Sequence, residues 1–386
     1  MRVRTTATSL GFWVDLPADL APATLPVSAA LLIMFPLACH FREDIDLEDP
    51  VDAVLLENLQ GVQQIWRSWY AGLGSVRINA SAATSHAAGA GTQTLASFSG
   101  GVDSFFTLLR RHHEITHLMS IAGFNTPMDD FGSMREHLAP IAARFGKRHV
   151  PVLTNIRYGG QGPTPYSIAD LMIGYAHGCL LAAIAHMMED HFATYIIPAS
   201  HQYAHLMPYG SHPLTDPLFS SAKLRVVHDG AAFDRVDRTA AVTHSSHALS
   251  VLHVCWQDFR RGNCSECQKC LRTMATLDLL GARESAASFD WSTYSLERLG
   301  STWLPADSDR AFFGEIADAA RARGRMDLVK AIETAMARSR RRARQLEAMG
   351  VAKKALDRVI RSNALTRRFW TATRPIRAGL RNVWSG

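Results

Sequence analysis

Short apolar runs alternate with longer amphipathic stretches through the middle of the chain. The short runs have the length of buried strands, and they predict strands at 95–98, 117–124, 149–155 and 194–199. In the longer stretches apolar residues recur every three or four positions, which predicts helices at 103–113, 134–145 and 168–189. This alternation predicts an α/β fold with a doubly wound parallel sheet covered by helices on both faces.

The first 90 residues follow a different pattern, which predicts a small N-terminal α+β module. Residues 3–16 and 29–37 favour strands, and residues 51–71 favour a helix that carries Trp66 and Trp69. The segment 80–91 is rich in small and polar residues, as expected of a linker. Residues 91–285 then form the predicted central domain.

Charge separates the last part of the chain from the rest. Residues 321–386 hold 18 Lys and Arg against 4 Asp and Glu, whereas residues 1–320 hold 23 against 31. Residues 286–386 therefore form a predicted helical, basic extension, with Gly350 as a break, and residues 321–386 could meet a nucleic acid or another anionic surface. Residues 363–384 also fit a basic amphipathic helix, but a helix packed on the body is favoured.

Composition is that of a globular protein, with 386 residues, 47% hydrophobic residues and 20% charged residues. No apolar run reaches the 18 or more residues that typically cross a bilayer. The nearest candidate, 27–39, begins too late for a usual signal peptide and is expected to be a buried strand. A cytoplasmic location is expected.

The most informative segment is the glycine turn Ser99-Gly100-Gly101-Val102-Asp103-Ser104. It lies between a predicted strand and a predicted helix. Adjacent glycines allow a sharp turn and a close approach of the backbone to a ligand, and the N–H groups at a helix start attract phosphate. Helix capping by Asp103 or Ser104 is the simpler alternative. The pattern matches at all six positions and favours nucleotide binding.

Four of the six cysteines follow the spacing C-x8-C-x2-C-x2-C, at Cys255, Cys264, Cys267 and Cys270. Four thiolates complete a tetrahedral zinc site and leave no position open for catalysis. An iron–sulfur cluster is the main alternative. Lys269 and Arg272 are placed to offset the charge of the thiolates, while Cys39 and Cys179 are expected in the core.

The glycine turn resembles the signature of the PP-loop ATP pyrophosphatases. Together with the cysteine spacing it resembles the 7-cyano-7-deazaguanine synthase branch of that superfamily, over roughly residues 92–282. The resemblance implies an adenine nucleotide alpha hydrolase-like (HUP) sheet, cleavage of ATP to AMP and pyrophosphate, and a structural zinc. It does not cover the terminal parts of the chain.

Further candidate residues follow the predicted strands, where ligands bind on such sheets. Phe124 follows the second strand, where PP-loop enzymes commonly hold adenine, and is a candidate for contact with that base. Asn155 ends the third strand and is a candidate for contact with substrate or phosphate. The long connection after residue 199 carries candidates for acceptor recognition or proton transfer: His201, His212 and Asp216. Arg235 and Arg238 precede the cysteines and are candidates for phosphate binding. Ordinary loop structure is the alternative for each.

These features predict an ATP-dependent ligase. A carboxylate or carbonyl oxygen of a small or macromolecular substrate would attack the α-phosphate of ATP, with Mg²⁺ near Asp103, and ammonia or an amine would then displace AMP. The start Met1-Arg2-Val3 offers no cysteine nucleophile, so the nitrogen is expected from another source. The alternatives are a tRNA-modifying PP-loop enzyme guided by the basic tail and a nucleotide-binding scaffold without turnover.

Overall fold

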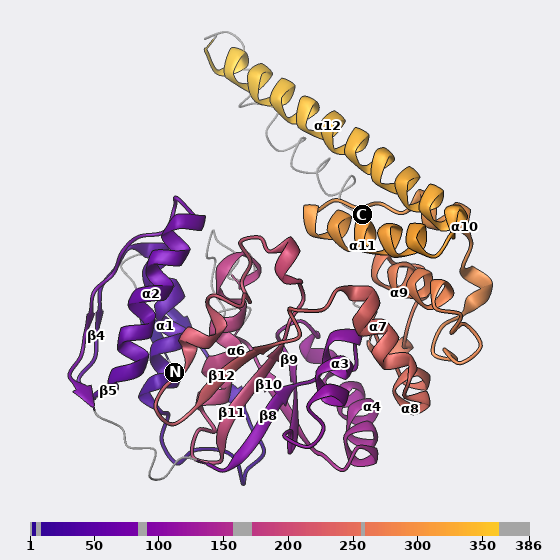
Figure 1. Ribbon diagram of the computed structural model, residues 1–386. Coiled ribbons are helices and arrows are strands. Elements are labelled where there is room, and N and C mark those ends of the chain that lie inside the picture. The colour runs from indigo at the N-terminus through magenta and orange to yellow at the C-terminus, as the bar shows by residue number, and fades with distance from the viewer. Residues whose placement is uncertain (1, 5–8, 84–90, 157–171, 256–258, 363–386) are drawn as a thin grey trace.

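A mixed six-stranded sheet forms the centre of the molecule in the computed structural model, which describes residues 2–4, 9–83, 91–156, 172–255 and 259–362 (Figure 1). The strand order is β12-β11-β8-β9-β10-β3. The strands are β3 (Val14–Asp15), β8 (Gln93–Ser97), β9 (His117–Ala122), β10 (Arg148–Thr154), β11 (Phe192–Pro198) and β12 (Arg225–Asp229). The predicted α/β class is therefore confirmed.

The sequence predicts a parallel sheet, but the observed sheet is mixed. Five strands run parallel, but β3 pairs antiparallel with β10 at the edge. The side chain of Asn155 holds this strand in place, because it accepts from the N–H of Trp13 and donates to the carbonyl of Gly11, both at 2.8 Å. The strand predicted over residues 3–16 includes β3, but a two-residue strand held by side chains has no hydrophobic pattern that could predict its antiparallel pairing with β10.

Two hydrophobic clusters cover the two faces of the sheet, and alternate residues of each strand belong to different clusters. On β8, Leu95 joins one cluster and Ala96 the other. The first cluster includes α1 (Val27–Phe41), α2 (Ala53–Trp69) and α6 (His177–His186). The second includes α3 (Val102–Arg110), α4 (Phe131–Arg144) and α9 (Gln268–Leu279). This alternation is the period of two that buried strands require.

The N-terminal residues share the first cluster with the sheet. Residues 27–41 form α1, so the predicted strand at 29–37 is wrong. This run is apolar on all sides, and such a run does not distinguish a buried helix from a buried strand. The helix predicted at 51–71 is confirmed as α2. The remaining N-terminal strands pair in twos: β1 (Arg2–Arg4) with β2 (Ser9–Gly11), β4 (Ile45–Asp46) with β6 (Ile78–Asn79), and β5 (Val51–Asp52) with β7 (Ala82–Ala83).

Helices make up the C-terminal part. They are α7 (Arg235–Thr243), α8 (Ser246–Ser250), α9, α10 (Leu296–Ser301), α11 (Asp307–Ala322) and α12 (Met326–Ser362). α12 extends away from the body (Figure 1). It runs through Gly350, so the predicted break there is wrong. The predictions for residues 363–384 lie outside the described residues.

Short helical turns complete the fold. They are Met128–Asp130, Tyr203–His205, Asp216–Phe219, Phe259–Arg261 and Trp291–Thr293, with a π-helical turn at Met172–Ala176. Within the described residues, none of the helices has the length and apolar character needed to cross a membrane.

Candidate functional site

The glycine turn joins β8 to α3 and has the geometry that the sequence predicts. Gly100 has φ +74°, a left-handed conformation that favours glycine, and Gly101 precedes the first turn of α3. The Ser104 hydroxyl donates to the carbonyl of Gly101 at 2.9 Å and accepts from the N–H of Ser99 at 3.3 Å. The first N–H groups of a helix have no carbonyl partner in that helix, so the start of α3 presents donors at the turn.

A pocket of about 240 Å³ opens beside this turn. Ser99, Asp103 and Ser104 line it together with Phe124 from the end of β9 and Ser200 from the end of β11. Numbered along the chain, the parallel strands lie in the order 3-2-1-4-5, so the order reverses between β8 and β11. Ligands of open α/β sheets bind at the carboxyl ends of the strands at such a reversal. The pocket occupies this position.

Asp103 is the anchor of two arginines from α7. Its two carboxylate oxygens accept from Arg235 at 2.8 Å and from Arg238 at 2.9 Å. Burial alone would raise the pKa of Asp103, but the two guanidinium groups outweigh it and hold the pKa below its usual value. Arg238 also donates to the carbonyls of Ala199 and Ser200, and so ties the end of β11 to the glycine turn.

Lys269 and Arg272 on α9 extend this basic cluster toward the pocket. Lys269 lines the pocket, and its pKa is lowered mainly by burial and also by the positive charges of Arg272 and Arg235. Arg272 is buried, with its guanidinium 4.3 Å from the centre of the Phe312 ring. The sequence had assigned both residues only to balancing the thiolates. Lys269 and Arg272 each stand two residues after a cysteine, at positions 267 and 270, and this spacing places both of them on α9 close to the four-cysteine site.

The cluster carries more positive than negative charge. Among the described residues, Asp103 is the only carboxylate that forms an ion pair with Arg235, Arg238, Lys269 or Arg272. Asp309 and Glu315 also favour the charged form of Arg272 at longer range, so four cations face three carboxylates. Within the described residues, the Nε atoms of these three arginines are buried and have no hydrogen-bond partner. Buried charge without a counter-charge is costly. The arrangement is therefore suited to an anion.

The loop after β11 divides its predicted residues between two places. His201 lies beside the basic cluster, stacked on Phe312 with ring centres 5.0 Å apart, and burial lowers its pKa to about 4. Asp216 is fully buried and accepts from the hydroxyl of Ser211 and from the backbone N–H of His212. His212 packs against the Trp69 ring. Asp216 and His212 therefore hold the loop together. Their neighbour Ser211 does line the pocket.

Two other predicted residues have different positions. Phe124 lines the pocket and contacts the His177 ring, with centres 4.9 Å apart. The amide of Asn155 is engaged with the backbone of Gly11 and Trp13, as described above, and Asn155 is not among the residues that line the pocket.

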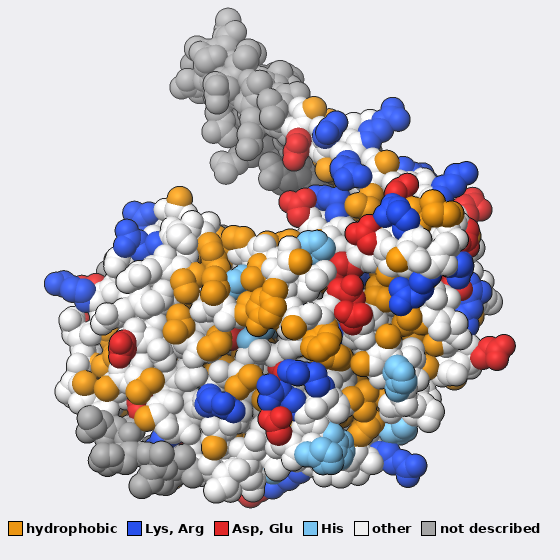
Figure 2. Space-filling view, viewed as in Figure 1, with side chains coloured by type: hydrophobic (Ala, Val, Ile, Leu, Met, Phe, Trp, Pro, Cys, Tyr) orange, Lys and Arg blue, Asp and Glu red, His pale blue; other side chains and the backbone are white. Residues whose placement is uncertain are grey.

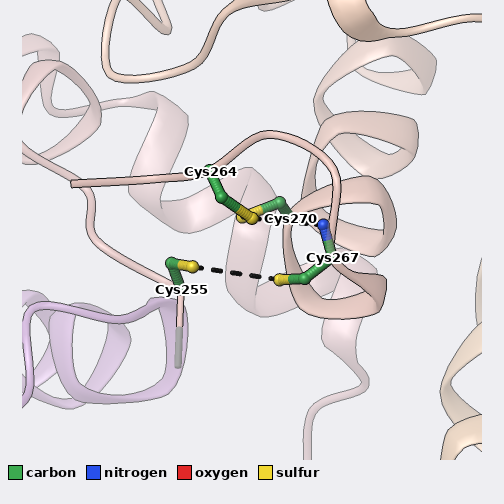
Figure 3. A group of neighbouring side chains, drawn as sticks. All are labelled: Cys255, Cys264, Cys267 and Cys270. Carbon is green, nitrogen blue, oxygen red and sulfur yellow. Dashed lines mark hydrogen bonds between the residues drawn. The ribbon is translucent and has the colours of Figure 1, made fainter. Parts of the chain in front are cut away.

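The four cysteines converge on one point (Figure 3). All four Sγ atoms lie within 4.8 Å of one another, with Cys255 and Cys267 4.0 Å apart and Cys264 and Cys270 3.8 Å apart. A tetrahedral zinc with Zn–S bonds of about 2.3 Å requires sulfur atoms about 3.8 Å apart. Asn263 shapes the segment, because its side-chain oxygen accepts from the N–H groups of Val254 and Cys255. The four cysteines can bind a metal such as zinc.

Comparisons were made with protein-family models, curated proteins and solved structures, and no match was found in any of the three. The resemblance to the PP-loop pyrophosphatases therefore remains an interpretation of the two motifs.

Proposed function

We propose that this protein binds ATP in the pocket beside the glycine turn and cleaves it to AMP and pyrophosphate in order to activate an acceptor oxygen. The sheet would then be of the doubly wound, adenine nucleotide alpha hydrolase-like type. The observation that carries the proposal is the convergence of the donor-rich start of α3 with an incompletely neutralised basic cluster on one pocket.

The phosphates fit the polar end of the pocket. The N–H groups at the start of α3 supply donors and the positive end of the helix dipole, and the hydroxyls of Ser99 and Ser104 lie at the same wall. Lys269 adds a cation that can reach a phosphate oxygen. Arg235 and Arg238 raise the local potential while Asp103 fixes their orientation.

Another part of the pocket wall suits a base. Met119 and Ile121 of β9, together with Phe124, give it an apolar and aromatic lining. Such a lining buries the faces of a purine, while a few polar groups fix its orientation. ATP would then lie across the carboxyl ends of β8 and β9.

The chemistry would be a displacement at the α-phosphorus. An acceptor carboxylate or carbonyl oxygen forms the new bond to phosphorus, and the bond to the bridging oxygen of the β-phosphate breaks. The electron pair leaves with pyrophosphate, whose charge is stabilised by the α3 terminus and Lys269. Ammonia or an amine then attacks the activated carbon and releases AMP. The proton lost by the incoming nitrogen would pass to water, because burial lowers the pKa of His201 to about 4 and leaves it too weak a base to hold that proton at pH 7.

Magnesium fits this site only through the phosphates. Asp103 is the only carboxylate among the described residues that line the pocket, and both its oxygens already accept from arginines. Mg²⁺ commonly keeps several waters and binds through substrate phosphates. Asp103 would therefore contact it through water, while ordering the arginines directly.

A metal at the four cysteines would be structural. Zinc fits the donor set and the sulfur spacing, and four thiolates leave no open position for substrate. The metal would stabilise the segment that leads into α9, which carries Lys269 and Arg272.

The test is calorimetric titration of the purified protein with ATP, together with chromatography of the nucleotide products in the presence of ammonia and a panel of carboxylates that includes a deazaguanine carboxylate. Lys269→Met should weaken ATP binding about tenfold or more, because it removes a charge from the pocket wall. Arg272→Met should weaken binding by a smaller factor, because Arg272 is buried against Phe312 and does not line the pocket. The exposed Lys330→Gln serves as the matched control. Equal affinity of all three variants and the wild type would place the nucleotide elsewhere.

Metal content measured on each variant keeps this result interpretable. Lys269→Met protein that retains its metal and its melting temperature but loses ATP binding supports a direct role for Lys269. AMP production by the wild type with one acceptor supports a ligase, and binding without AMP production with any acceptor supports the scaffold alternative.

A further inference from the structure

The projecting helix α12 carries a cluster of arginines that the proposed function does not use. Five of the seven residues at 338–344 are arginine and none is acidic. Figure 2 shows Lys and Arg side chains gathered over the end of the molecule from which this helix extends. Arg338, Arg340, Arg341 and Arg344 are exposed.

These arginines differ from those nearer the body. Arg310 pairs with Asp307, Arg321 with Asp318 and Glu333, and Arg325 with Asp278 and Asp327. Within the described part of the chain, Arg338, Arg340, Arg341 and Arg344 form no ion pair. Arg342 is also exposed, but it lies over the Trp303 ring at 4.7 Å. Arg310, Arg321 and Arg325 are thus balanced by nearby carboxylates, whereas the projecting arginines are left for a partner.

The packing of α12 directs this cluster outward. Leu328, Ile332, Ala335 and Ser339 are buried and form the side of the helix that contacts the body. Residues turn by about 100° along a helix, so the four unpaired arginines spread over roughly 160° of the remaining surface. Between Arg340 and Met349, the large apolar residues exposed on α12 are Leu346 and Met349.

We propose that α12 binds duplex DNA by placing its arginines against the phosphates on both walls of the major groove. An α-helix with its side chains is about 10–12 Å wide and the groove of B-DNA is about 12 Å wide. The deep, narrow major groove of duplex RNA does not admit side chains in this way. A membrane-surface helix needs a broad apolar face opposite its charges, and here the body occupies that face as far as Ser339. Duplex DNA therefore fits best.

The experiment is a fluorescence anisotropy titration of a labelled, random-sequence DNA duplex with the full chain at several KCl concentrations. Binding should weaken as salt rises, because counterions are released from the DNA. Replacement of Arg338, Arg341 and Arg344 together by Gln should lower the slope of log K against log salt by roughly 2.7, about 0.9 for each lost phosphate contact.

Two variants and two further ligands complete the test. A triple replacement of the same arginines by Lys keeps the charge and should keep most of the slope. The triple control Arg321→Gln, Arg323→Gln and Lys330→Gln removes equal charge from exposed positions near the body and should leave the slope unchanged. An unchanged slope in the Arg338, Arg341 and Arg344 variant overturns the proposal. So does binding to an RNA duplex or to phosphatidylserine vesicles in preference to the DNA duplex.

Discussion

The backbone N–H of His253 donates to the carbonyl of Gly100 at 2.8 Å. This bond joins the glycine turn to the cysteine segment, because His253 lies two residues before Cys255. The same segment leads into α9, which places Lys269 and Arg272 at the basic cluster. The four-cysteine segment is therefore connected both to the glycine turn and to the helix that carries Lys269 and Arg272.

Loss of the metal should weaken ATP binding as well as stability. Cys270→Ser removes a buried thiolate from the set of four, so the segment around His253 and Lys269 loses its anchor. We expect loss of bound metal, a lower melting temperature and at least tenfold weaker ATP binding. Metal analysis, thermal unfolding and calorimetry measure the three quantities.

The matched control is Cys39→Ala, a buried cysteine outside the cluster. It should retain its metal and its ATP affinity even if its melting temperature falls. Normal ATP affinity in metal-free Cys270→Ser protein would show that the glycine turn does not depend on the metal.

Gly100→Ala should destabilise the turn. Alanine in the left-handed conformation costs roughly 1–2 kcal/mol, and its Cβ would lie 3.1 Å from Leu138 Cδ2. We expect that loss in the free energy of unfolding, measured with urea, and weaker ATP binding. Gly132→Ala, at a helix position where the new Cβ meets nothing within 4 Å, should be neutral or slightly stabilising.

Asp103→Asn should destabilise the protein at neutral pH. The substitution leaves two buried guanidinium groups facing a neutral side chain, which costs roughly 3 kcal/mol. Because Arg235 and Arg238 lower the folded-state pKa of Asp103 despite its burial, its contribution is present above the unfolded pKa of about 3.9 and is lost as the pH falls further. The difference between variant and wild type should shrink in urea unfolding below pH 4. A constant difference at every pH would contradict this.

Stability should also fall as the pH drops from about 6.5 toward 4, because of buried histidines. Burial lowers the pKa of His149 and His201 to about 4, whereas an unfolded histidine titrates near 6.5. The unfolded state therefore binds more protons than the folded state in this pH range. The loss of stability caused by the two histidines is complete below pH 4.

His149→Gln should reduce this pH dependence by roughly 2 kcal/mol between pH 6.5 and 4. His149 bonds to Ser120 at 2.6 Å, so the glutamine keeps a polar partner there. His113→Gln, at an exposed position, should leave the dependence unchanged. Urea unfolding at several pH values measures both variants, and an identical pH slope in His149→Gln and wild type would refute the assignment.

The central strands and helices could be predicted from the sequence because their side chains alternate between two separate clusters or repeat at helical spacing. The strands at Leu95 and His117 and the helix after Gly101 are examples. The helix α1 could not be predicted in the same way, since its run is apolar on every side. The edge strand β3 depends on side-chain bonds from Asn155, which no local pattern encodes.

At the site, the glycine turn and the four-cysteine cluster could be predicted from the sequence, because the spacing of neighbouring residues determines their geometry. The pairing of Asp103 with Arg235 and Arg238 joins residues more than 130 positions apart, so the sequence could name these residues but not their relation. Asp216 looked chemically active in the sequence. Its burial with Ser211 and His228 gives it a structural role that only the fold reveals.

Cleavage between the α- and β-phosphates is tested most directly with two ATP analogues. The protein, its acceptor and ammonia should convert β,γ-methylene ATP to AMP and methylenediphosphonate, because the α–β bond of this analogue is intact and cleavable. α,β-Methylene ATP should bind without reaction. Release of inorganic phosphate from α,β-methylene ATP, with β,γ-methylene ATP left unreacted, would contradict the account.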